Sequence, residues 1–154
     1  MDKEQFTNEI LKLEKSLYYT AKSILGNDED CADVLQNAIL KAFANLDSLR
    51  EEQYFKTWMT KIVLNESYAM IRKNKATVSY EEYMENAAVS DSQAYSEIYM
   101  EIQALEEKYR LPFVLHYVNG FTLKEIAAML GNSEAGIKMR LLRARDILKK
   151  QLAV

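Results

Sequence analysis

The segment from residue 121 to residue 150, FTLKEIAAMLGNSEAGIKMRLLRARDILKK, restricts the fold of this chain more than any other. Apolar residues recur at helical spacing on both sides of Gly131, which predicts two short helices joined by a tight turn. Thr122 and Glu125 form a capping box at the start of the first helix, and Asn132 or Ser133 can cap the second. A helix, a glycine-containing turn and a basic helix are together typical of a helix-turn-helix.

The second helix of this segment separates an apolar stripe from a basic surface. The residues expected to be buried are Ile137, Leu141, Ala144 and Leu148. The basic side chains lie at other helical positions: Lys138, Arg140, Arg143, Arg145, Lys149 and Lys150. Periodicity alone also permits a helical hairpin whose basic face is simply solvated, so at this point both interpretations stay open.

The composition favours long helices throughout. The 154 residues include only four Gly and one Pro, and Leu, Ala, Lys and Glu are frequent. A single cysteine, Cys31, cannot form an internal disulfide framework, and its place on an apolar stripe predicts a buried, unreactive thiol. The sequence shows neither a secretory leader nor an apolar run long enough to insert into a membrane. We therefore expect a soluble, cytoplasmic protein.

Three long helices are predicted in the first half of the chain. The first covers residues 3–25 and ends at Gly26, and the second is capped by Asn27 and runs to about residue 46. The apolar stripe of this second helix includes Phe43. After a loop at residues 47–54, a third helix covers residues 55–72, where the spacing of Trp58 with Phe55 and Ile62 favours a core position for the indole.

The second half begins with a stretch that lacks a helical stripe. Residues 74–92 contain clustered Glu and Ser, and helical spacing resumes near Ala94 with Ile98, Ile102 and Leu105. A further helix over residues 108–118 tolerates Pro112 only if this residue lies in the first turn. The predicted fold is all-α, with two small helical domains (residues 1–75 and 94–154) joined by an acidic linker (residues 76–93), the second domain containing the helix-turn-helix.

The charge is unevenly distributed, although the net value is only −3. Residues 76–110 hold two basic and eight acidic side chains, whereas residues 111–154 hold seven basic and three acidic ones. Residues 51–75 also carry an excess of basic side chains. Two basic segments separated by an acidic one are expected of a protein that contacts nucleic acid at two places.

A series of short motifs runs through both predicted domains. In the first domain they are Asp33-Val34-Leu35-Gln36, Leu46-Asp47-Ser48-Leu49-Arg50, Phe55-Lys56-Thr57-Trp58, Asn65 and Arg72-Lys73. In the second they are Tyr109-Arg110, Tyr117, Gly120, Glu125-Ile126-Ala127, Leu130-Gly131 and Arg143-Ala144-Arg145. In this order and with these spacings, the motifs resemble those of a known family, the extracytoplasmic-function (ECF) sigma factors of bacteria. The chain differs from the usual family residues at Asn37, Ala69, Gly136 and Ile137.

The resemblance implies an alternative sigma factor that binds core RNA polymerase and directs promoter-specific initiation, with an anti-sigma protein as a further partner. Its first domain would bind the polymerase clamp and capture non-template bases of the minus-10 element, and its second would bind the minus-35 element. The polymerase-binding residues would be Asp33, Gln36, Asn37 and Lys41. The minus-10 residues would be Tyr54, Lys56, Lys61, Asn65, Arg72 and Lys73. The minus-35 residues would be Lys138, Met139, Arg140, Leu142 and Arg143.

Two other classes of function were weighed against this one. A stand-alone helix-turn-helix regulator that binds duplex operators would need a sensor domain, and the sequence has no signature of an apolar ligand pocket. An enzyme would need paired carboxylates, a metal-ligand cluster or a phosphate-binding loop, and none is visible. Lone His116, on an apolar helix, is expected to be structural. We therefore expect no catalytic residue, no metal and no cofactor.

Overall fold

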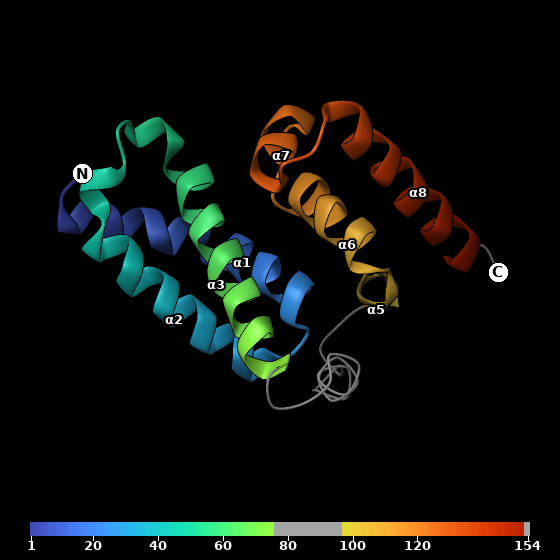
Figure 1. Ribbon diagram of the computed structural model, residues 1–154, viewed down its shortest axis with the longest axis horizontal. Helices are drawn as coiled ribbons and strands as arrows, with labels where there is room; N and C mark the ends of the chain where they lie inside the picture. The colour runs from blue at the N-terminus through green and yellow to red at the C-terminus, as the bar shows by residue number, and fades with distance from the viewer. Residues whose placement is uncertain (76–96, 153–154) are drawn as a thin grey trace. The chain divides into compact units, whose positions relative to one another are not determined.

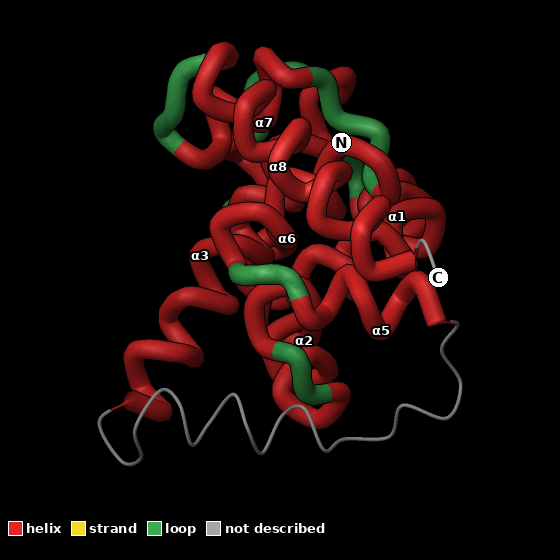
Figure 2. Tube along the Cα trace, turned by 90° about the vertical axis from the view of Figure 1, so that its right-hand side faces the viewer, coloured by secondary structure: helices red, strands yellow, loops and turns green. Residues whose placement is uncertain are grey.

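Helices and connecting turns make up the residues that the computed structural model describes, 1–75 and 97–152 (Figure 2). The chain divides into two compact units, one in each of these ranges. The predicted all-helical fold is thus confirmed for the described residues. The predicted acidic linker, and the expected helix start near Ala94, lie outside them.

The first unit contains three long helices that pack against one another in all three pairs (Figure 1). They are α1 (Lys3–Leu25), α2 (Asp28–Ala44) and α3 (Phe55–Lys75). Gly26 ends α1 with φ 77°, a conformation that glycine adopts at little cost. Asn27 caps α2 by accepting the Asp30 N–H at 3.1 Å.

Two short 3₁₀ turns connect α2 to α3, namely η1 (Leu46–Ser48) and η2 (Glu52–Tyr54). Helix α2 ends earlier than its predicted end near residue 46. Asn45 accounts for this early end, because its side-chain amide donates to the Lys41 carbonyl at 2.9 Å, one of the last carbonyls of the helix. The loop that joins α2 to α3 therefore starts from a capped helix end.

Apolar side chains from all three helices form the core of the first unit. The largest fully buried ones are Leu17, Ile24, Leu25, Val34, Met59 and Val63. Phe43, predicted as part of this core, is instead 47% exposed. Its ring packs against Phe6 with centroids 5.6 Å apart, so only part of the ring is covered.

The second unit begins with α5 (Glu97–Ala104) and α6 (Glu107–Phe113), followed by a short π-helix, η3 (Val114–Val118). It continues with α7 (Leu123–Leu130) and α8 (Glu134–Leu152). Helix α8 packs against α5, α6 and α7. The side chains buried in this unit include Leu105, Leu115, Ile126, Ile137, Ala144 and Leu148. Ile98, which was expected on the apolar face of α5, is 49% exposed.

The helix predicted over residues 108–118 is corrected by the structure. Pro112 lies in the interior of α6, beyond its first turn, and α-helical pairing gives way to η3 just after it. The Asn119 N–H donates to the Val114 carbonyl five residues back, at 2.9 Å. Proline has no N–H and its ring crowds the preceding turn, so a regular α-helix is disfavoured here. Buried Arg110 braces the same region by donating to the Leu105 carbonyl at 2.6 Å.

Candidate nucleic-acid interfaces

The predicted recognition helix, α8, is anchored by one complete apolar stripe. Ile137, Leu141, Ala144 and Leu148 are all buried, as their spacing predicted. At its start the Ser133 hydroxyl accepts the Gly136 N–H at 3.0 Å, which identifies Ser133 as the N-cap. Because the stripe fixes the rotation of the helix about its axis, it also determines which side chains face outward.

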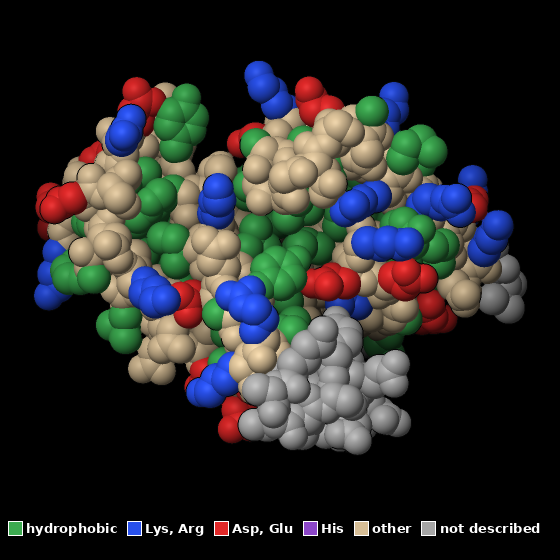
Figure 3. Space-filling model, in the orientation of Figure 1, with side chains coloured by type: hydrophobic (Ala, Val, Ile, Leu, Met, Phe, Trp, Pro, Cys, Tyr) green, Lys and Arg blue, Asp and Glu red, His purple; other side chains and the backbone are tan. Residues whose placement is uncertain are grey.

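The five predicted minus-35 residues lie away from that stripe. Lys138 and Arg143 are exposed, as are Met139 (59%) and Leu142 (46%), whereas Arg140 is half-buried at the edge of the stripe. In Figure 3 several Lys and Arg side chains gather over α8. Four of the five candidates are therefore exposed on the side of α8 opposite its buried stripe, and Arg140 lies at the edge of that side.

The turn before α8 is held by hydrogen bonds on both sides of α7. Thr122 and Glu125 form the predicted capping box, with bonds of 2.9 and 3.1 Å. At the other end Gly131 adopts φ 70°, and the Asn132 N–H donates to the Ala127 carbonyl at 2.9 Å. His116 donates its Nδ1–H to the Phe121 carbonyl at 2.7 Å, since a carbonyl can only accept. His116 thus ties η3 to the start of α7, which is a structural contact.

In the first unit, α3 presents most of the predicted minus-10 residues. Lys61, Asn65 and Arg72 are exposed at spacings of four and seven residues, so they share one face of the helix. Lys73 is exposed beside them and Lys56 is half-buried in the first turn. Tyr54, 57% exposed, ends η2 just before α3. The exposed ring of Tyr54 thus directly precedes a helix that carries a row of exposed polar and cationic side chains.

Trp58 joins α3 to the preceding loop. Its indole is half-buried and packs against the Phe55 ring at 5.8 Å, while its Nε1–H donates to the Ser48 hydroxyl at 3.3 Å. The sequence predicted a core position for this side chain, and the structure shows that only part of the side chain is buried. Helical spacing could not reveal the Ser48 contact, because that residue lies in η1 on the other side of the loop.

The outer face of α2 carries the predicted polymerase-binding residues. Asp33, Gln36, Asn37 and Lys41 are all exposed. Lys41 also forms an ion pair with Glu66 of α3 at 2.5 Å, so it is engaged in holding the two helices together. Leu40, 63% exposed on the same face, was overlooked by sequence reasoning. Its position four residues after Gln36 was the available signal.

The only cysteine, Cys31, is buried in the folded chain. Burial raises the pKa of the Cys31 thiol to about 12, partly offset by the positive charge of Lys22. Burial also lowers the pKa of Lys22, whose ammonium is 2.7 Å from the Asp28 carboxylate. These groups lie at the turn between α1 and α2, and the predicted burial of Cys31 is confirmed.

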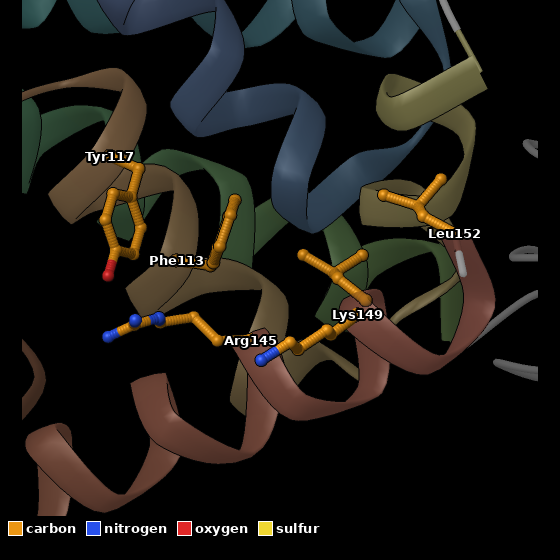
Figure 4. Close-up of a pocket in the computed structure, with 6 residues that line it drawn as sticks. Phe113, Tyr117, Arg145, Lys149 and Leu152 are labelled. Carbon is orange, nitrogen blue, oxygen red and sulfur yellow. The ribbon is translucent and has the colours of Figure 1, made fainter.

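A shallow pocket of about 410 Å³ lies between α6, η3 and α8. Phe113, Leu148 and Leu152 supply its apolar lining, and Arg145 and Lys149 its charge. Figure 4 shows the hydroxyl end of Tyr117 directed toward Arg145. The pocket uses the flank of α8 that faces the rest of its unit, so it is separate from the outward-facing minus-35 candidates.

Within residues 1–75 and 97–152 there is no group of three His, Cys, Asp or Glu side chains arranged to hold a metal ion. Over the same residues, every helix is too short or too polar to cross a membrane.

Family models match both units. The model of sigma-70 region 2 matches residues 10–77 and that of sigma-70 region 4 matches residues 95–148. The chain is 27% identical to the ECF RNA polymerase sigma factor SigW of Bacillus subtilis, over 98% of this chain and 90% of that protein. It is 26% identical to the RNA polymerase sigma factor SigV of the same species, over 99% of this chain and 96% of that protein.

Solved structures also match the fold of this chain. The sigma factor RpoE of Bartonella quintana, in complex with the anti-sigma factor NepR, is similar with a TM-score of 0.79 and 25% identity over 98% of both chains. CnrH, in complex with the cytosolic domain of CnrY, is similar with a TM-score of 0.72 and 24% identity over 99% of this chain and 90% of that one.

Two helical units matching regions 2 and 4, over most of the chain, define a promoter-recognition subunit of bacterial RNA polymerase. The chain belongs to the ECF sigma factors of the sigma-70 family. It is an alternative sigma factor that binds core RNA polymerase and directs promoter-specific transcription initiation. A stand-alone operator-binding regulator is not favoured, because the region 2 match covers the domain that would have had to act as its sensor. The family consists of initiation factors that are not enzymes.

Proposed function

We propose that the two units divide promoter recognition between them, with α8 binding the duplex minus-35 element and α3 and its preceding loop capturing the minus-10 element. The observation that carries this proposal is the outward face of α8. Its buried stripe leaves Lys138, Met139, Leu142 and Arg143 exposed. Arg140 reaches a phosphate from the edge of the same face. A helix presented in this way fits the major groove, where cations contact phosphates and base edges carry the sequence.

In the first unit, the minus-10 element is held as a single strand. Tyr54 stacks on an unpaired base, Asn65 hydrogen-bonds a base edge, and Lys56, Lys61, Arg72 and Lys73 neutralise phosphates. The exposure of Tyr54 and the row of Lys61, Asn65 and Arg72 along α3 support this assignment. Stacking on aromatic rings beside a cationic groove is the usual way in which proteins hold single strands.

Core polymerase binds the outer face of α2 through Asp33, Gln36 and Asn37. Exposed Leu40, at the centre of the same face, supplies apolar contact area. Lys41 contributes at the edge while it keeps its ion pair with Glu66. The chemistry of RNA synthesis belongs to the polymerase, so this chain needs no catalytic group, metal or cofactor, and it acts in the cytoplasm where transcription takes place. The functional domains are residues 1–75 and 94–154, with residues 76–93 as the acidic linker.

An anti-sigma protein regulates the chain by binding it in place of core polymerase. The support is that the solved structure of RpoE is a complex with the anti-sigma factor NepR. A purified partner isolated with the tagged chain should therefore compete with core polymerase for it. A partner that joins the polymerase complex without displacing the chain would contradict this assignment.

Site-specific photocrosslinking in the holoenzyme tests which unit contacts which promoter element. A photoreactive amino acid at Met139 should crosslink to duplex DNA near position −35, and one at Tyr54 to the non-template strand near position −10. The same amino acid at Leu11, which is 62% exposed on α1, is the control and should not reach DNA. Crosslinks from Met139 to polymerase alone would overturn the proposal that α8 binds the minus-35 element.

A further inference from the structure

The outward face of α8 carries a narrow apolar strip. Ala135, Met139 and Leu142 follow one another at four and three residues, so they lie on one face of the helix, away from the buried stripe. All three are exposed, with Met139 at 59% and Leu142 at 46%. Two large, exposed apolar side chains on a helix face flanked by Lys138 and Arg143 require an explanation.

The charges around the strip indicate what it faces. At 100° per residue, Lys138 and Arg143 fall on opposite sides of the strip, and both are exposed. One turn after Leu142, the carboxylate of Asp146 is paired with Lys150 at 3.4 Å. A carboxylate would repel phosphate, so the DNA-facing stretch ends before Asp146. The strip therefore lies in the first half of α8, flanked by cations, which is the part of a recognition helix that enters the major groove.

Methionine and leucine cannot hydrogen-bond the polar groups on base edges. The apolar group that B-DNA offers in the major groove is the C5-methyl group of thymine. We propose that Met139 and Leu142 read thymine methyl groups, so that the minus-35 element of this sigma factor has A·T pairs at the positions beneath the strip. This inference rests on the proposed binding of α8 to the minus-35 element and adds the base identity that its centre selects.

The test uses holoenzyme assembled from core polymerase and the full chain. Selection from duplexes with a randomised minus-35 region should enrich thymine, on either strand, at one or two positions. Each of these thymines is then replaced by deoxyuridine, which removes only the methyl group. Loss of one buried methyl should weaken binding about fourfold. The Leu142→Ala or Met139→Ala variant facing that base should bind thymine and deoxyuridine duplexes equally.

A matched control is Lys149→Ala, on the same helix but beyond the DNA-facing stretch, which should keep the full response to deoxyuridine. If the wild type binds both duplexes equally while Arg143→Ala weakens DNA binding, the methyl readout is wrong and the placement of α8 stands. If selection enriches no minus-35 sequence, both the methyl readout and the proposed binding of α8 to the minus-35 element are wrong. If Leu142→Ala instead reduces binding to core polymerase and leaves DNA affinity unchanged, the strip is a protein contact and the inference is overturned.

Discussion

At the scale of single residues, Arg143 and Lys138 should differ in how they contribute to DNA binding. If Arg143 reads a base, Arg143→Ala should cost about 1–3 kcal/mol and relax specificity at one promoter position. If Lys138 contacts only phosphate, Lys138→Ala should weaken all sequences alike and reduce the salt dependence. Footprint titrations at several salt concentrations measure both effects. Affinities unchanged by either substitution would contradict the proposed contact of this face with DNA.

Asn65 should act in promoter opening rather than in initial binding. Asn65→Ala should allow the closed complex to form at the minus-35 element but impair melting near position −10, because a captured base offsets a few kcal/mol of unstacking. Permanganate reactivity of unpaired thymines measures the melting, and a pre-melted template should restore transcription. Asn8→Ala, an exposed asparagine on α1, is the matched control. Normal opening of linear promoters by Asn65→Ala would show that base capture does not depend on this residue.

Cys31 should report on global unfolding. With its pKa raised to about 12 by burial, the thiol should resist alkylation near pH 8 and react quickly once the chain is unfolded in denaturant. The raised pKa means that the folded state holds this proton more tightly. The associated stability is fully present below the unfolded-state pKa near 9 and is lost as the pH rises toward 12. Equal alkylation rates in folded and unfolded chains would refute this account of the thiol.

At the scale of elements, the outer face of α2 should be the polymerase-binding surface of the first unit. Replacing Gln36 and Asn37 with Glu adds two negative charges to this exposed face, so co-purification with core polymerase should be lost. The helical circular dichroism should be unchanged, because neither side chain is buried. Asn8→Glu on α1 serves as the control for added surface charge. Retained co-purification would move the docking surface elsewhere.

The capping box of α7 should stabilise the second unit measurably. Thr122→Ala removes the oxygen that accepts the Glu125 N–H, and should lower the free energy of unfolding by about 1 kcal/mol. Thr122→Ser keeps this oxygen and should stay close to the wild type. Denaturant titration of all three proteins makes the comparison. Equal losses in both variants would point to the lost methyl group rather than the cap.

Helical periodicity was sufficient to predict features that depend only on residues close together in the sequence. The bounds of α1, the capping box at Thr122 and the buried stripe of α8 follow from spacings within one helix. Features that depend on a second element were not predictable in this way. The Lys41–Glu66 ion pair joins two helices, the Trp58–Ser48 bond crosses a loop, and the exposure of Phe43 depends on how much of its ring the Phe6 side chain of α1 covers. The condition that Pro112 lie in the first turn was wrong, because α6 accommodates it further along and continues as a π-helix from Val114.

Family motifs supplied most of the residues of the candidate site, and the structure shows which of them are exposed. The motifs identify residues but do not indicate how exposed they are. In the structure, the buried stripe of α8 leaves four minus-35 candidates exposed and Arg140 half-buried. Leu40 escaped the motif search because an apolar residue on a polar face resembles a core residue until the rotation of the helix is known.

At the scale of the whole molecule, the central claim is that this chain gives core polymerase its promoter specificity. Run-off transcription tests it most directly, using purified core polymerase, a library of genomic fragments from the source organism, and sequencing of RNA 5′ ends with and without the chain. The account predicts a discrete set of new 5′ ends that depends on both proteins, with shared upstream sequences near −10 and −35. Identical 5′ ends in both reactions, with the chain binding duplex fragments in the absence of core polymerase, would contradict it.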